Sequence, residues 1–366
     1  MAALADLKAT AELYIKWDPN PATRGAIQNM LDEGRTDDLS SVLSKRLKFG
    51  TAGLRAKMGP GYNRMNDLVV LQTTQGLALY LEKQFGAAAA HEKGVAIGYD
   101  HRANDSLSSK KFGAIASAVL LSRGFKVYLV EKDGFAATPI VAFCTLEKSC
   151  AAGIMVTASH NPKEDDGYKV YWDNGAQIVP PHDSGIASCI LEALEPWEAY
   201  GTSFPTDDSI RNHPNCVDPT DEISPKYFKK ASDTLCFYPQ LHEKWGDELK
   251  VVYTAMHGVG NMWCLRSFEA FQLSPYYPVK RQCDPDPTFP TVAFPNPEEG
   301  EGALQLAFEE AERVGASIVL ANDPDADRLA VAERGAAGGG WKVFNGNEIG
   351  ILLGHWMWRN HVAQGG

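Results

Sequence analysis

Apolar residues recur along this chain with two spacings, which separate expected helices from expected strands. Longer stretches carry apolar side chains every three or four residues, and we expect helices there: residues 4–17, 22–47, 67–85 and 107–123. Shorter apolar runs have the length of buried strands: residues 95–99, 126–130 and 151–156. The alternation predicts an α/β fold made of consecutive three-layer α/β/α domains with mixed, mostly parallel sheets.

Three apolar runs end in loops of unusual polar content. They precede the segments Thr157-Ala-Ser-His-Asn-Pro162, Thr254-Ala-Met-His-Gly-Val-Gly260 and Asn322-Asp-Pro-Asp-Ala-Asp-Arg328. In mostly parallel sheets, ligands gather at the loops that leave the carboxyl ends of strands. These three loops are therefore the first places to look for chemistry.

The polar stretch 201–222, which contains prolines, glycines and several aspartates, marks an expected domain boundary. The glycine-rich segment 335–340 is either a second boundary or a hairpin loop. After it, a helix capped by Asn345 would carry an apolar stripe with no later strand to cover it. We expect two domains, 1–205 and 206–335, and the opening segment of an incomplete third domain, 336–366.

Composition narrows the classes of function. The 366 residues carry a formal net charge of −11, which argues against nucleic acid or an anionic membrane as the main partner. The seven cysteines include no C-x-x-C pair, which argues against a disulfide framework or a zinc site. The start of the chain lacks a secretory pattern, and no apolar run approaches the ~20 residues of a membrane span. We expect a cytoplasmic protein.

Ser159 is the first candidate for chemistry, because it follows an expected buried strand. A serine hydroxyl needs a neighbouring base or a metal ion to act as a nucleophile. His160 and Lys169 are available for proton transfer or for contact with a phosphate group. The alternative interpretation is a helix-capping serine beside a surface histidine.

Asp323, Asp325 and Asp327 stand at alternate positions directly after another expected strand. Three carboxylates in an extended loop converge readily on one hard cation such as Mg²⁺ or Ca²⁺. An EF-hand loop is excluded, because the positions that need glycine and glutamate hold Arg328 and Arg334. The alternative is an acidic, solvated turn.

Three weaker signals accompany these two loops. The segment Phe49-Gly-Thr-Ala-Gly-Leu-Arg55 permits close backbone approach and offers Arg55 to a phosphate group, although a flexible loop is the better explanation of this segment taken alone. The turn around His257 is best explained by a structural role. The pair Asp100 and Arg102 is best explained as a local salt-linked turn.

Together, the segments TASHNP, DPDADR and FGTAGLR resemble the α-D-phosphohexomutase superfamily. Further segments resemble its phosphoglucomutase-2 branch, which holds phosphoglucomutase/phosphopentomutases and glucose-1,6-bisphosphate synthases: WDPNP, GPGYNRMNDL, DGYKVYWDNGAQI, DPDPTFPTV and PNPEEGEGAL. The resemblance covers essentially the whole chain, and its three main motifs occur in the family's order.

The resemblance implies a mechanism and a set of site residues. Ser159 would carry a phosphoryl group, transfer it to a sugar monophosphate and recover the other phosphate from a glucose 1,6-bisphosphate-type intermediate, which also serves as activator. One Mg²⁺ per chain would be held by phosphorylated Ser159 together with Asp323, Asp325 and Asp327. His160 and Lys169 would move protons, while the substrate would be bound by Ser159 and by three further residues: Arg55, Asp327 and Arg328.

The implied reactions interconvert glucose 1-phosphate and glucose 6-phosphate, or ribose and deoxyribose 1- and 5-phosphates, in a monomer whose partners are small sugar phosphates. The family's third and fourth domains carry a sugar-specificity loop and a further phosphate loop, and neither segment follows residue 340. We therefore expect this chain to be truncated at its C-terminus and weakly active or inactive as a mutase. The alternatives are a glucose-1,6-bisphosphate synthase, a non-catalytic phosphosugar-binding protein and a Mg²⁺-dependent phosphatase.

Overall fold

The computed structural model describes residues 2–197, 207–238, 249–299, 301–335, 339–363 and 365. These residues form two compact units. The first unit comprises residues 1–158 and 163–223, and the second comprises residues 159–162 and 224–366. The expected boundaries after residues 205 and 335 fall at stretches 198–206 and 336–338, which lie outside the described residues.

Three N-terminal helices pack around a small core to which Tyr62 and Leu68 also contribute: α1 (Ala2–Trp17), α2 (Pro21–Asp32) and α3 (Thr36–Leu43). Asn20 caps α2 by accepting a hydrogen bond from the backbone N–H of Ala22. The single helix expected over residues 22–47 is wrong. Gly34 adopts a left-handed backbone (φ 67°) that ends α2 and lets the chain turn into α3.

The first unit is built on a six-stranded sheet in the order β1-β7-β6-β2-β5-β8. β2 pairs in parallel with β5 and β6, whereas β7 runs antiparallel to both β6 and β1. The strands are β1 (Leu54–Lys57), β2 (Val95–Tyr99), β5 (Val127–Leu129), β6 (Ala152–Val156), β7 (Asp165–Trp172) and β8 (Cys216–Val217).

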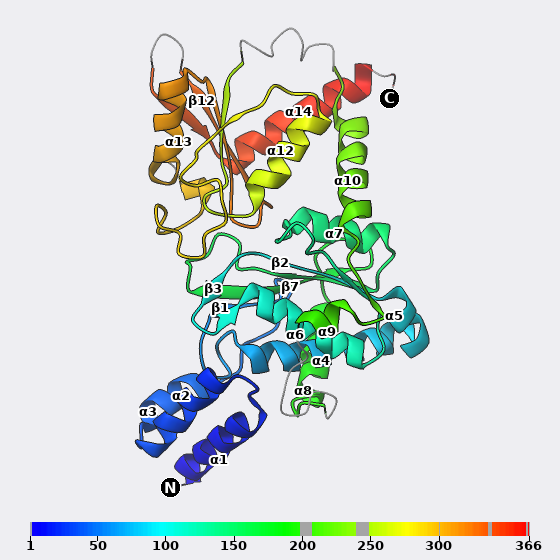
Figure 1. Cartoon of the computed structure of the whole chain (residues 1–366), viewed down its shortest axis with the longest axis vertical. Helices are drawn as coiled ribbons and strands as arrows, with labels where there is room; N and C mark the ends of the chain where they lie inside the picture. Colours follow the sequence, from blue (N-terminus) through cyan, green and yellow to red (C-terminus); the bar gives the residue numbers. More distant parts are fainter. Residues whose placement is uncertain are drawn as a thin grey trace. The chain divides into compact units, whose positions relative to one another are not determined.

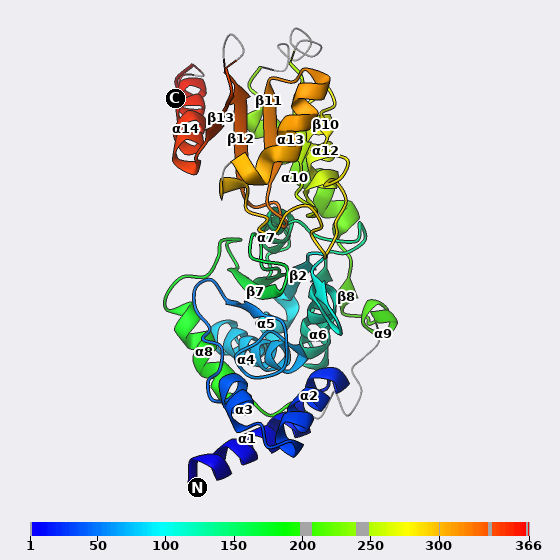
Figure 2. The ribbon, with the colours of Figure 1, turned by 90° about the vertical axis from the view of Figure 1, so that its left-hand side faces the viewer.

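Helices cover both faces of this sheet. Figures 1 and 2 show α7 (Thr138–Glu147) on one face and α4 (Asp67–Phe85) and α6 (Ser109–Ser122) on the other. α8 packs along α4. The remaining elements are α5 (Ala87–Lys93), β3 (Ala103–Asn104), β4 (Leu107–Ser108), α8 (His182–Glu192) and α9 (Asp207–Arg211). α10 (Thr220–Leu235) runs across the division between the two units.

The second unit holds a five-stranded sheet in the order β10-β9-β11-β12-β13. β9 pairs in parallel with β10 and β11, and the other pairs are antiparallel. The elements are β9 (Val251–Thr254), α12 (Gly260–Ala270), β10 (Tyr277–Pro278), η2 (Pro297–Glu299), α13 (Glu301–Val314), β11 (Ile318–Asn322), β12 (Leu329–Arg334), β13 (Trp341–Phe344) and α14 (Gly346–Ala363). Figure 1 shows α13 on one side of this sheet and α12 and α14 on the other.

The α/β class with mostly parallel sheets is confirmed. β12 and β13 pair antiparallel, which favours the hairpin interpretation of residues 335–340, of which 336–338 lie outside the described residues. The described part of the chain contains no helix with both the length and the apolar character needed to cross a membrane.

Candidate active site at the Ser159 and Asp323 loops

Ser159 lies in the short loop between β6 and β7. The hydrogen-bonded pairing of these strands continues past β6, because the N–H of Thr157 donates to the carbonyl of Gly167 at 3.1 Å. Ser159 then takes a left-handed backbone (φ 54°), which a residue with a Cβ adopts only where its surroundings enforce it. Its side chain is only 2% exposed. The serine is thus held in one orientation, as a reactive hydroxyl requires.

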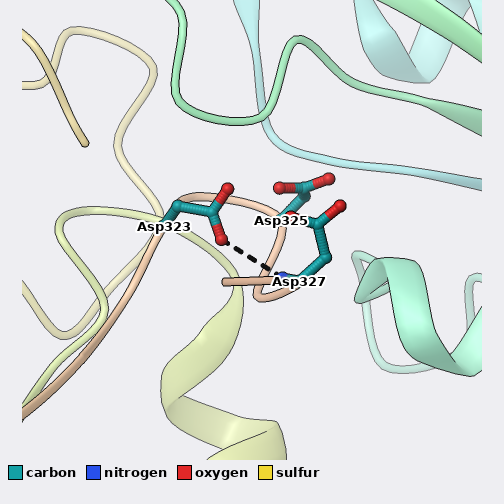
Figure 3. Close-up of side chains that lie close together, drawn as sticks. All are labelled: Asp323, Asp325 and Asp327. Atoms are coloured by element: carbon teal, nitrogen blue, oxygen red, sulfur yellow. Dashed lines mark hydrogen bonds between the residues drawn. The ribbon is translucent and has the colours of Figure 1, made fainter. Parts of the chain in front are cut away.

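The loop after β11 wraps around the Asp323 carboxylate. Oδ1 of Asp323 accepts hydrogen bonds from the N–H groups of Asp327 (3.2 Å) and Arg328 (2.9 Å), and Figure 3 shows the first of these as a dashed line. Asn322 also fastens the loop, since its Nδ2 donates to the carbonyl of Arg328 at 2.5 Å. The hydroxyl of Tyr253 on β9 orients Asn322 with a 2.8 Å hydrogen bond to its Oδ1.

Asp323, Asp325 and Asp327 each offer one carboxylate oxygen within a group spanning no more than 4.8 Å. Asp323 and Asp325 are completely buried, and Asp327 is exposed. Burial, followed by the charges of Asp325 and Asp327, raises the pKa of Asp323 well above its ordinary value, although Ser159 lowers it in part. A bound cation would relieve this repulsion, and three carboxylate oxygens with one open side suit Mg²⁺.

The structure brings the two candidate loops together. Within the second unit, the hydroxyl of Ser159 donates a 2.5 Å hydrogen bond to Oδ2 of Asp323. Nδ1 of His160 lies 3.3 Å from the same hydroxyl. A candidate nucleophile, a neighbouring imidazole and an acid cluster therefore lie close together.

The turn around His257 packs against the loop that carries Asp323, Asp325 and Asp327. Gly258 lies so close to Pro324 that an added Cβ would stand 2.3 Å from the Pro324 Cα atom. The N–H of Val259 donates to the Pro324 carbonyl at 2.8 Å. Nε2 of His257 lies 2.7 Å from the Thr291 hydroxyl, and burial lowers the pKa of this imidazole. These contacts give the turn a structural role, as the sequence indicated.

Arg55 and Lys169 lie in the first unit, on the neighbouring strands β1 and β7. Arg55 stands directly opposite Gly167, which is two residues from Lys169. Because side chains alternate along a strand, Arg55 and Lys169 project from the same face of the sheet. Gly53 permits the turn before Arg55, since it has φ 74° and an added Cβ would stand 1.9 Å from the carbonyl oxygen of Tyr168.

Arg328 belongs to the second unit and is already engaged. Its Nη1 donates to Oε2 of Glu298 at 2.8 Å, and about a third of its side chain (35%) is exposed. Contact with a phosphate group would require Arg328 to exchange this carboxylate for the phosphate oxygens.

Sequence reasoning missed a buried network beneath the Ser159 loop. Asp100 was explained as part of a salt-linked turn with Arg102, and their 3.5 Å ion pair exists. Asp100 also accepts hydrogen bonds from Thr157 (2.7 Å) and Ser109 (2.6 Å). The available signal was that Asp100 and Thr157 both follow apolar strands, whose carboxyl ends meet if the strands are parallel neighbours.

Comparison with known families and proteins adds independent information. Residues 46–196 match the model for α/β/α domain I of phosphoglucomutase/phosphomannomutase, and residues 225–338 match the model for its domain II. A phosphopentomutase from Homo sapiens is 48% identical over 94% of this chain and 55% of its own length. A glucose 1,6-bisphosphate synthase from Homo sapiens is 44% identical over 96% of the chain and 55% of its own length.

The chain thus spans about half the length of the curated relatives it matches. Among solved structures, a putative phosphomannomutase from Thermus thermophilus has a TM-score of 0.59 at 22% identity, covering 79% of this chain and 57% of that one. At that identity the likeness supports the fold alone.

Proposed function

The chain belongs to the phosphoglucomutase/phosphomannomutase family, and from that premise we propose that it moves a phosphoryl group between two hydroxyl positions of a sugar phosphate, using Ser159 as the carrier. The observation that supports this most directly is the 2.5 Å hydrogen bond from Ser159 to Asp323, beside two further carboxylates. Phosphoryl transfer depends mainly on positioning and on neutralising charge, and both are available at these loops.

Asp323, Asp325 and Asp327 would hold one Mg²⁺, which when bound neutralises negative charge on the phosphoryl oxygens. The buried carboxylates otherwise repel both one another and an incoming phosphate group. Arg55, Lys169 and Arg328 would bind and orient phosphoryl oxygens, with Arg328 leaving Glu298 to do so. Asp327, the exposed member of the acid cluster, would also contact the substrate.

In the forward half-reaction, the bond between the phosphorus and Oγ of phosphorylated Ser159 breaks while a bond to a sugar hydroxyl oxygen forms. The sugar hydroxyl proton passes to a base, for which His160 and Lys169 are the candidates. Oγ of Ser159 takes up a proton as it leaves the phosphorus, and the product is a sugar bisphosphate. In the return half-reaction, Oγ of Ser159 bonds to the other phosphorus while the bond from that phosphorus to the sugar oxygen breaks. The serine proton passes to a base, and the sugar oxygen takes up a proton to become a hydroxyl. We propose Nδ1 of His160 as that base, and its distance of 3.3 Å from Oγ in the unphosphorylated chain supports this role.

A second candidate function is the synthesis of glucose 1,6-bisphosphate, which is favoured by the 44% identity to a synthase of that name over 96% of this chain. It would use the same serine and acid cluster, but the phosphoryl donor would be an external acyl phosphate. The two functions differ in the donor that recharges Ser159, which makes them separable by experiment.

The test is phosphorylation of the purified chain with glucose 1,6-bisphosphate and Mg²⁺, followed by intact mass and peptide mapping. We expect one phosphoryl group, on Ser159, and none on the Ser159→Ala variant. Ser106, on an exposed turn, provides the matched control as Ser106→Ala. Labelling that survives Ser159→Ala, or binding of sugar phosphates without any labelling, would contradict the proposal and favour a non-catalytic binding protein.

Substrate choice is measured next, with ribose 1-phosphate and glucose 1-phosphate as competing acceptors for the phosphorylated chain. A mutase returns monophosphate product and phosphorylated serine. A synthase releases the bisphosphate and is recharged by an external acyl phosphate.

A further inference from the structure

The first unit contains a hollow of about 460 Å³ that the proposed reaction does not use. It lies between residues 46–49, α4 and α8, and the described residues that line it all belong to the first unit. Its walls are mostly apolar: Leu47, Phe49, Leu54, Val69, Ile190 and Leu191. The volume falls within the range of about 300–1,000 Å³ that is typical of small-molecule sites.

Arg46 presents a fixed guanidinium group to this hollow. Its Cζ atom stands 3.9 Å above the centre of the Tyr62 ring, and its Nη1 donates to Oε1 of Gln72 at 2.7 Å. Gln72 is itself held, because its Nε2 donates to the carbonyl of Leu194 at 2.6 Å. The Arg46 guanidinium group is therefore held in one orientation by the face of the Tyr62 ring and by the buried amide of Gln72.

No acid neutralises Arg46 among the residues that the structure describes. Its contacts there are a ring and an amide, and burial lowers the pKa of this guanidinium. Lys48 also lines the hollow and likewise forms no ion pair within the described ranges. Two unneutralised cations at one apolar hollow contrast with a chain whose net charge is −11. Their charge favours an anionic occupant.

Asp183, in the first turn of α8, adds an unused acceptor to the same wall. Its Oδ1 atom is buried and receives no hydrogen bond from any described residue. A buried acceptor left in this state carries a desolvation cost. An occupant that places a hydroxyl or ammonium donor beside Asp183 would recover that cost.

We propose that this hollow is a binding site for a small organic anion, with a carboxylate or phosphate group on Arg46 and Lys48, an apolar body against the leucine and phenylalanine walls, and a donor group beside Asp183. None of these residues belongs to the Ser159 or Asp323 loops, so the proposal stands apart from the proposed reaction. It assigns the chain a second small-molecule site.

Occupancy of this site has a structural consequence for the neighbouring turn. Phe49 and Leu54 line the hollow at the two ends of the turn that Gly50 and Gly53 close with a pair of backbone hydrogen bonds, 2.8 and 3.2 Å long. A ligand touching both ends would restrain that turn. Backbone amides of residues 50–54 should then exchange more slowly with solvent.

Calorimetry measures the binding of phenyl phosphate and 3-phenylpropionate to the full chain. Each of these probes carries both an anionic group and an aromatic ring. Inorganic phosphate, which lacks the ring, and benzyl alcohol, which lacks the anionic group, are the comparison probes. Hydrogen exchange locates the bound probe. We expect phenyl phosphate or 3-phenylpropionate to bind more tightly than inorganic phosphate or benzyl alcohol does. Hydrogen exchange should become slower in residues 46–54 and 183–191 and should not change in residues 323–328. The better of the two whole probes identifies the head group.

Two variants and one control decide the outcome. Arg46→Gln should weaken binding about tenfold, as loss of one charge-assisted contact predicts. Ala187→Phe on α8 should fill the hollow and abolish binding without touching a charge, so it still tests the proposal if Arg46→Gln is unstable. Lys57→Gln, an exposed cation on β1, should change nothing. Binding unaffected by both variants, binding displaced by saturating glucose 6-phosphate, or no binding at millimolar probe would overturn the proposal.

Discussion

The hydroxyl of Thr157 donates a 2.7 Å hydrogen bond to Oδ2 of Asp100, and both side chains are completely buried. Thr157 follows β6 and Asp100 follows β2, so the bond ties together the carboxyl ends of two parallel strands. It fixes the backbone two residues before Ser159. The orientation of the candidate nucleophile thus depends on a contact between residues 57 positions apart.

Ser109 and Asp166 belong to the same buried network. The Ser109 hydroxyl lies 2.6 Å from Oδ1 of Asp100 and 3.0 Å from Oδ2 of Asp166, but it has one proton to donate. Burial, and then the charge of Asp100, raises the pKa of Asp166 well above its ordinary value.

Replacing Thr157 tests the importance of its hydroxyl. Thr157→Val keeps the shape but leaves an Asp100 oxygen without its donor, and we expect a loss of about 1–3 kcal/mol in the free energy of unfolding. Urea unfolding measures it. Thr157→Ser retains the hydroxyl and serves as the control, with a loss below about 1.5 kcal/mol from the missing methyl group. Equal losses in both variants would show that packing, and not the hydrogen bond, holds this loop.

Asp18 predicts a pH dependence of stability. It accepts a 2.6 Å hydrogen bond from the Thr23 hydroxyl, and burial raises its pKa from 3.8 to about 6. The folded chain therefore holds this proton more tightly than the unfolded chain does. The resulting stabilisation is complete below about pH 4 and is lost as the pH rises through about 6.

The Asp18→Asn variant cannot titrate at this position. Relative to it, the wild type should lose up to about 3 kcal/mol of unfolding free energy between pH 4 and 7. Urea unfolding across this range checks the difference. Asp37→Asn, on the exposed side of α3, should follow the wild-type profile. If the difference in unfolding free energy between wild type and Asp18→Asn does not change with pH, Asp18 is not the cause of the pH dependence of stability.

The acid cluster predicts stabilisation by Mg²⁺. Because a ligand that binds only the folded chain stabilises it by mass action, the thermal midpoint should rise with Mg²⁺ and fall when a chelator removes it. Asp325→Asn should reduce this response and raise the midpoint in chelator, since it removes one of the repelling charges. Asp284→Asn, an exposed acid in the same unit, should retain the full response. A Mg²⁺ response that survives in Asp325→Asn would place the cation elsewhere.

Gly258 predicts that the acid loop depends on its neighbour. An added Cβ would stand 2.3 Å from the Cα atom of Pro324, so Gly258→Ala must displace the backbone between Asp323 and Asp325. We expect a loss of about 1–3 kcal/mol in stability together with weaker Mg²⁺ stabilisation. Gly302→Ala on α13 meets nothing within 4 Å and should be neutral or stabilising by up to about 1 kcal/mol. An unchanged Mg²⁺ response in Gly258→Ala would refute the dependence.

The sequence pattern predicted much of the fold, because the spacing of apolar residues that indicates a helix or a strand lies within a short stretch of the chain. The apolar run at residues 95–99 is the fully buried strand β2, and the periodic stretch at 67–85 is α4 at the same bounds. The expected helix over 22–47 was wrong because a single glycine, Gly34, favours a left-handed turn that outweighs continued periodicity. The expected site roles and domain limits remain predictions, including the roles of Ser159, His160 and Lys169.

By itself, the sequence determined the α/β class, the family to which the chain belongs and the loops in which chemistry was to be sought, because each depends on short stretches of residues. Only the tertiary structure decided that the Ser159 hydroxyl meets the Asp323 carboxylate, that Thr157 donates to Asp100, and that Arg46 lines a mostly apolar hollow and forms no ion pair with any described residue. The physical reason is that burial, charge and hydrogen bonding act through space. A residue's partner is set by the packing of distant strands and helices, which no local pattern records.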